Sequence, residues 1–112
     1  MSFFKKLFRI GKKPGTPAYR YEQAAAIHGQ AIKFVTEHID GNENIVGRGG
    51  SVSLIDGNLM IDTSGERLFS CDARVVDISW LMSGNGAIIS GPNALDSDRR
   101  RALTVHFVYY RK

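Results

Sequence analysis

Residues 51–62, SVSLIDGNLMID, carry the pattern that decides the fold. Val52 and Leu54 alternate with Ser51 and Ser53, and Leu59 and Ile61 alternate with Met60 and Asp62. This period of two is typical of half-buried β-strands. The residues between the two segments, Asp56-Gly57-Asn58, are of the types that form a tight turn. The stretch therefore predicts a β-hairpin.

The alternation continues through the second half of the chain. We expect further strands over residues 67–72, 76–82, 87–90 and 103–110, separated by turns at 64–66 and 84–86 and by a polar loop over 91–98. The last strand is apolar on both faces near its end, which predicts a strand that is central in the sheet or covered on both sides. The side chains that we expect in the core are Leu54, Ile61, Val76, Ile78, Trp80, Ile88, Val105 and Phe107.

A long helix is predicted ahead of the strands, over residues 17–40. Thr16 followed by Pro17 is typical of a helix start, and apolar residues then recur at steps of three and four. Asp40-Gly41-Asn42 is typical of a helix end. The expected fold class is α+β, with one long N-terminal helix followed by a six- or seven-stranded antiparallel meander. Such short strands are expected to form a small barrel or a strongly bent sheet.

The net positive charge belongs to the first residues of the chain. The 112 residues are enough for one domain, and their formal charge is +4. Residues 1–15 contain five cations and no acid, whereas the remaining ten cations face eleven acids. We therefore divide the chain into a basic N-terminal arm, residues 1–15, and a single α+β domain, residues 16–112.

The arm separates apolar from basic side chains if it is plotted as a helix. At about 100° per residue, its apolar residues fall within an arc of about 160°, and its cations occupy the opposite face. The apolar residues are Phe3, Phe4, Leu7, Phe8 and Ile10, and the cations are Lys5, Lys6, Arg9, Lys12 and Lys13. This pattern is typical of a helix that lies in the interface of an anionic membrane. Packing on the domain, contact with a second copy, and a flexible leader are the alternatives.

No residue pattern indicates a catalytic, cofactor or metal site. His28 and His38 would lie about 15 Å apart along the predicted helix, too far to share a metal. Cys71 is expected to be a small buried apolar residue, because nothing near it in sequence would activate a thiolate. Asp72 and Asp77 are expected in solvated turns. We therefore expect no cofactor and no enzymatic activity.

Three features bear on the partner and on the location of the protein. Arg99, Arg100 and Arg101 could contact an anion such as phosphate, and Trp80 with the Tyr109-Tyr110 pair could stack on nucleic-acid bases. The single cysteine, the absence of a continuous apolar leader and the lack of a long apolar run predict a cytoplasmic protein.

The run GSVSLIDGNLMIDTSGERLFSCDARVVDISWLMSGNGAIISGPN, residues 50–93, resembles the core of small bacterial pleckstrin-homology-like domains. The resemblance covers roughly residues 50–110 and implies a scaffold that binds lipids, peptides or proteins. In that family the helix follows the strands, whereas the predicted helix here precedes them. The segment LMSGNGAII, residues 81–89, is also similar to a signature of Sm-like RNA-binding barrels.

The function expected from these observations is binding without catalysis. The leading hypothesis is an interaction module that docks on a membrane surface or a protein partner through its arm, with self-association as a further option. A nucleic-acid-binding Sm-like barrel is the alternative.

Overall fold

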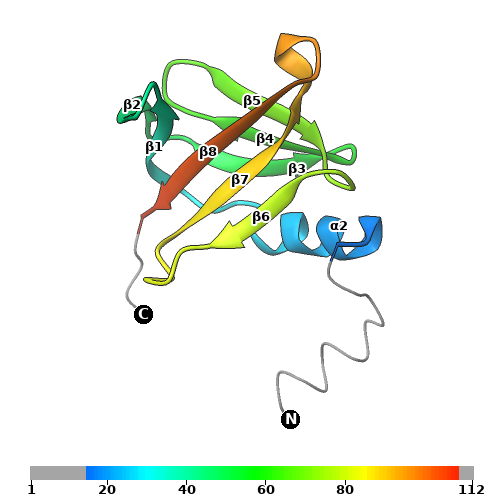
Figure 1. The fold of residues 1–112 in the computed structure, drawn as a ribbon. Helices are drawn as coiled ribbons and strands as arrows, with labels where there is room; N and C mark the ends of the chain where they lie inside the picture. Colours follow the sequence, from blue (N-terminus) through cyan, green and yellow to red (C-terminus); the bar gives the residue numbers. More distant parts are fainter. Residues whose placement is uncertain (1–14, 109–112) are drawn as a thin grey trace.

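The chain folds into two antiparallel β-sheets and one short helix, as Figure 1 shows for a computed structural model that describes residues 15–108. In chain order the elements are α2 (Pro17–Ala26), β1 (Ile32–Ile39), β2 (Asn42–Arg48), β3 (Ser51–Ile55), β4 (Asn58–Asp62), β5 (Arg67–Asp72), β6 (Asp77–Trp80), β7 (Gly86–Asn93), the 3-10 helix η1 (Ala94–Asp96) and β8 (Arg99–Phe107).

The prediction of a long helix over residues 17–40 is wrong in its second half. The helix ends at Ala26, and Gly29 then adopts a positive φ of +87° that breaks it. Residues 32–39 form β1 instead, because this segment is rich in β-branched side chains, which favour strands. Asp40 and Gly41, predicted as a helix cap, both have positive φ and form the two-residue turn between β1 and β2. The start of the helix is confirmed, with Pro17 in its first turn.

The prediction of a single small barrel or bent sheet is also wrong. Among the described residues, eight strands divide into a five-stranded sheet in the order β2-β1-β8-β7-β6 and a three-stranded sheet in the order β3-β4-β5, with no closed barrel. The extra strands are β1, which lies within the segment predicted as helix, and β2, which lies in a segment for which no strand was predicted. The antiparallel pairing and the hairpin over residues 51–62 are confirmed, and β8 is the central strand of its sheet, which is one of the two arrangements predicted for it.

The core lies between the two sheets and is closed on one side by α2. Val35, Leu103 and Val105 of the larger sheet meet Leu59 and Phe69 of the smaller one, and all five are fully buried. Ala24 and Ile27 extend this core to α2.

The predicted core residues divide into three groups. Ile61, Val76, Val105 and Phe107 are buried as expected, and Leu54 and Ile78 are half-buried against the core. Trp80 and Ile88 are exposed, so their predicted burial is wrong. Trp80 is the last residue of the edge strand β6, and the register of β7 alternates Ile88 with the buried Ala87 and Ile89, which places Ile88 on the outer face.

The chain passes from one sheet to the other through Gly49 and Gly50, which both have positive φ. A methyl group on Gly50 would overlap the carbonyl group of Asp62, so both the positive φ and the lack of space exclude a side chain there.

We expect Gly50→Ala to destabilise the protein by roughly 2–4 kcal/mol in a denaturant titration, from backbone strain and overlap together. Gly57→Ala is the matched control. Gly57 also has positive φ but has nothing near its Cβ position, so only the strain should remain. Equal losses in the two variants would contradict this explanation.

Candidate docking surface

The arm on which the sequence places the docking residues lies outside the described residues. This holds for each of its expected contact residues: Phe3, Phe4, Lys5, Lys6, Leu7, Phe8, Arg9, Ile10, Lys12 and Lys13. The structure does describe where the arm joins the domain. Gly15 borders a hollow of about 100 Å³ whose walls include Arg20 of α2 and Asp77 and Ser79 of β6. The arm therefore joins the domain beside β6.

The junction between arm and domain is held by local hydrogen bonds. The side chain of Thr16 accepts a bond from the backbone N–H of Tyr19 at 3.2 Å, which caps the start of α2. Arg20, one turn later, donates to the carboxylate of Asp77 at 3.0 Å and so ties α2 to β6. A segment that joins the chain at Gly15 is thus attached to a fixed point on the sandwich.

Exposed apolar side chains gather at the end of the sandwich where β6 turns into β7 and β8 finishes. We call this surface the apolar end and define it by the exposed Trp80, Met82 and Val108 together with the half-buried Leu81. Trp80 is 47% exposed, Met82 is fully exposed and Val108 is 37% exposed. Backbone bonds from Leu81 to Gly86 and from Phe107 to Asn85 hold the turn against β8.

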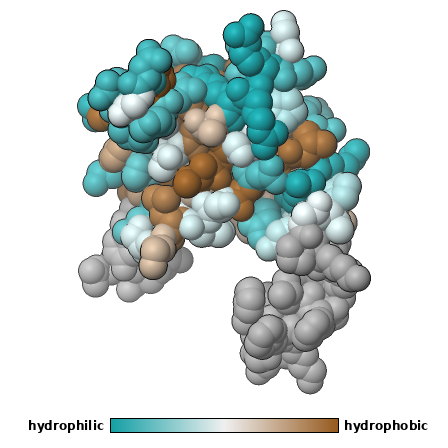
Figure 2. All heavy atoms as spheres, in the orientation of Figure 1, coloured by the Kyte–Doolittle hydropathy of each residue, from teal (hydrophilic) through white to brown (hydrophobic). Residues whose placement is uncertain are grey.

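The ring of Trp80 connects the apolar end to the core. Its centroid lies 6.0 Å from that of the buried Phe107, in a tilted arrangement. Figure 2 shows apolar atoms at the surface in the middle of the view and toward the end of β8. Sequence reasoning considered Trp80 as a core residue and as a base-stacking residue, but it did not connect Trp80 with Met82 or Val108. A signal was nevertheless present, since Met82 directly precedes the turn residues Ser83-Gly84-Asn85.

The three arginines predicted to contact anions each lie beside a carboxylate. Arg101 forms a two-pronged pair with Glu37 at 2.8 and 2.9 Å and donates to the carbonyl oxygen of Leu68 at 2.7 Å. It thereby links β8 and β1 to β5 of the other sheet. Arg100 pairs with Asp77 at 2.9 Å, and Arg99 approaches Asp96 at 3.7 Å. Arg101 is largely covered, while Arg99 and Arg100 remain mostly exposed.

Asp77 is the carboxylate on which Arg20 and Arg100 converge. Partial burial would raise its pKa, but the hydrogen bonds from the two guanidinium groups outweigh burial and hold the pKa below its ordinary value. A carboxylate whose pKa is lowered by folding stabilises the fold while it is ionised. This contribution is complete above the ordinary pKa of about 3.9 and is lost as the pH falls through the lower folded value.

We expect Asp77→Asn to lower the stability of the protein at neutral pH by about 1 kcal/mol, because both ion pairs are half exposed and screened. The difference from wild type should shrink toward zero as the pH falls below about 4, where the native carboxylate also becomes neutral. Urea titrations at several pH values measure this. Asp40→Asn, in an exposed turn, is the control and should have little effect. A deficit that persists in acid would contradict the electrostatic explanation.

The side chains tested for chemistry are not assembled into a site. Burial raises the pKa of the Cys71 thiol to about 11, so the thiolate is scarce at neutral pH, and Cys71 is buried as predicted. The Nδ1 atom of His28 accepts the backbone N–H of Leu54, while His38 contacts Glu43 on the β1–β2 hairpin. Within residues 15–108 no group of three or more His, Cys, Asp or Glu side chains could hold a metal ion.

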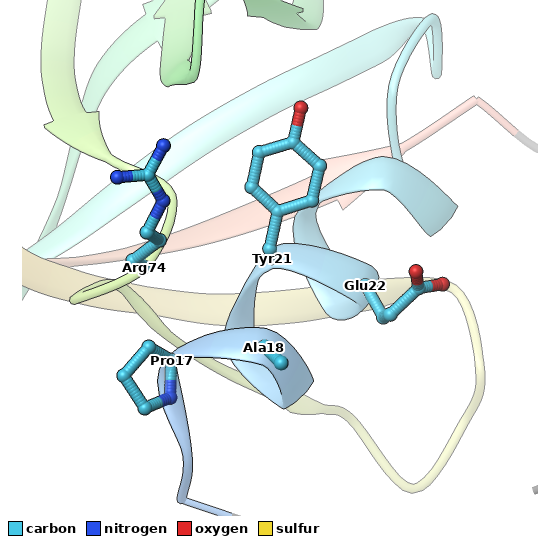
Figure 3. Close-up of a pocket in the computed structure, with 5 residues that line it drawn as sticks. All are labelled: Pro17, Ala18, Tyr21, Glu22 and Arg74. Atoms are coloured by element: carbon cyan, nitrogen blue, oxygen red, sulfur yellow. The ribbon is translucent and has the colours of Figure 1, made fainter. Parts of the chain in front are cut away.

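A second hollow lies over α2, opposite the hollow at Gly15. Its volume is about 310 Å³, and it is lined by Pro17, Ala18, Tyr21, Glu22 and Arg74. Figure 3 shows the Tyr21 ring and the Arg74 side chain extending in the same direction from α2 and from the β5–β6 turn, while Glu22 points to another side. The polar side chains around this hollow do not converge on one point, as they do in a ligand site. Its residues therefore offer only contact area on the helix.

No helix of the described part of the chain is long and apolar enough to cross a membrane. No family model, curated protein or solved structure matches the chain.

Proposed function

We propose that the protein is a binding module without catalytic activity, which docks through its N-terminal arm on an anionic membrane surface as a peripheral protein of the cytoplasmic face. The observation that carries the proposal is the separation of five apolar from five basic side chains within residues 3–13. Such a segment gains free energy at a lipid interface from two sources: attraction of its cations to anionic headgroups, and burial of its phenylalanines.

The resemblance of residues 50–110 to pleckstrin-homology-like domains supports a binding role, because that scaffold binds ligands or partner proteins and catalyses no reaction. The resemblance is one of pattern and transfers no ligand residues. Two stacked antiparallel sheets are compatible with such a scaffold, although the helix here precedes the strands.

Nucleic acid is the less favoured ligand. The arginine run on which that alternative relied has each guanidinium group beside a carboxylate, which offsets its field. The described residues also carry eight cations against eleven acids, so the folded domain is net acidic. An acidic surface repels a phosphate backbone and binds it poorly.

The test is co-sedimentation of the intact protein with two sets of vesicles. In one set half of the lipid is anionic phosphatidylserine, and the other set is phosphatidylcholine alone. We expect binding to the anionic vesicles only, and we expect it to weaken steeply between 50 and 500 mM salt because salt screens the cations of the arm. Equal binding to both vesicle types, or none to either, would overturn the proposal.

Packing of the arm on its own domain or on a second copy makes a different prediction. In those cases Phe4→Ala with Phe8→Ala would lower the melting temperature or the oligomeric state of the protein in solution. Membrane docking instead predicts that these two substitutions leave the melting curve unchanged and weaken vesicle binding.

A further inference from the structure

The charges of the chain are divided between the folded domain and its two ends. Residues 15–108 contain eight cations and all eleven acids, for a net charge of −3. Residues 1–14 and 109–112 contain seven cations, namely Lys5, Lys6, Arg9, Lys12, Lys13, Arg111 and Lys112, and no acid. The whole net positive charge therefore resides in the two terminal segments.

Both terminal segments join the domain on one side. Figure 1 shows α2, the β6–β7 turn and the finish of β8 on the lower side of the molecule. Gly15 borders the hollow beside β6, and Val108 donates its backbone N–H to Ala31, next to the start of β1, which pairs with the finish of β8. The apolar end thus includes the point where the C-terminal segment begins, at Val108, and its Trp80 is the last residue of β6, the strand beside which Gly15 lies.

The apolar end also lacks repulsive charge. Neither residues 78–88 nor residues 102–108 contain an acid. The nearest acid in sequence, Asp77, is paired with both Arg20 and Arg100. The tail that follows Val108 begins with Tyr109 and Tyr110, a residue type enriched at the boundary between lipid and water.

From these observations, and resting on the proposed function, we infer that the sandwich docks end-on: the apolar end, Trp80, Leu81, Met82 and Val108, enters the interface of the anionic membrane beside the arm. The charge division sets this orientation, because the basic ends are attracted to the surface while the acidic domain is repelled. The exposed apolar side chains at the contact then gain from partial transfer out of water. Trp80 suits this position, because tryptophan is enriched at membrane interfaces.

Trp80 is the single tryptophan of the chain and reports directly on this contact. The full-length protein is mixed with phosphatidylserine-containing vesicles whose acyl chains are unlabelled or brominated. We expect the Trp80 emission to shift to shorter wavelength on binding and to be quenched by the brominated chains. Met82→Ser should weaken binding about tenfold by removing one buried apolar side chain. Leu95→Ser is the control, because Leu95 is also an apolar side chain at the surface but lies on η1, at the opposite end of the sandwich, and should not matter.

The outcomes separate this inference from the proposed function. If the protein co-sediments with anionic vesicles while Trp80 is neither shifted nor quenched, or while Met82→Ser binds like wild type, docking is not end-on but the arm still binds. If nothing co-sediments, the proposed function itself fails. A shift in Trp80 emission that depends on protein concentration and needs no lipid would show that a second copy covers the apolar end, which also overturns the inference.

Discussion

Replacing Lys5 and Lys6 together by glutamate should lower the affinity of the protein for anionic vesicles by roughly a thousandfold. Each cation near such a surface contributes about 1 kcal/mol, so neutralising two of them removes about 2 kcal/mol. The new carboxylates add repulsion of similar size, which brings the loss to about 4 kcal/mol. Vesicle titrations at low salt measure the change, because high salt would mask it.

The matched control for this experiment is Arg99→Glu with Arg100→Glu, which changes the net charge of the protein by the same amount. These two arginines lie where β8 begins, at the opposite end of the sandwich from the apolar end. We expect the control to lose much less affinity than the arm variant. An equal loss would mean that the arginine run supplies the anion contact.

Substituting Phe69 by alanine should produce the largest loss of stability, about 3–5 kcal/mol. Phe69 is fully buried on β5 and is the largest of the fully buried side chains within residues 15–108, so its removal leaves a cavity between the two sheets. The melting temperature should fall by more than about 12 °C for a domain of this size. Ile55→Ala is the control, because Ile55 is about half exposed at the end of β3, and its loss should stay below about 1 kcal/mol. A small effect at Phe69 would contradict the assignment of the core.

The local features of the fold could be predicted from the sequence, whereas the division into two sheets could not. Alternation and a glycine turn suffice to define the hairpin over residues 51–62, because both signals involve neighbours in the chain. The helix prediction extended too far because apolar residues continue at steps of three and four up to Ile39. The same segment can also form a strand, and in the structure this strand buries Val35 and Thr36. Gly29, three residues after the helix ends at Ala26, has a positive φ, which a continued helix does not allow.

Contacts between distant residues account for the rest. Arg101 pairs with Glu37 across 64 positions of sequence, and no local pattern indicates that partner. The exposure of Trp80 depends on β6 being an edge strand, which follows from the order of the strands and not from the alternation of Ile78 and Trp80. The arm stays a prediction from sequence, because its residues lie outside the part of the chain that the structure describes. The apolar end was not recognisable from the sequence, because it is assembled from a turn and from the end of a strand about 25 residues away.

The most direct test of membrane docking compares the intact protein with a variant that lacks residues 2–13, at equal lipid and salt, by co-sedimentation with anionic vesicles. A melting curve of each protein checks that the domain, which is described from residue 15 onward, remains folded. Docking through the arm predicts that the intact protein sediments with the vesicles and that the folded variant stays in the supernatant. Equal sedimentation of the two proteins, or none of the intact protein, would contradict it.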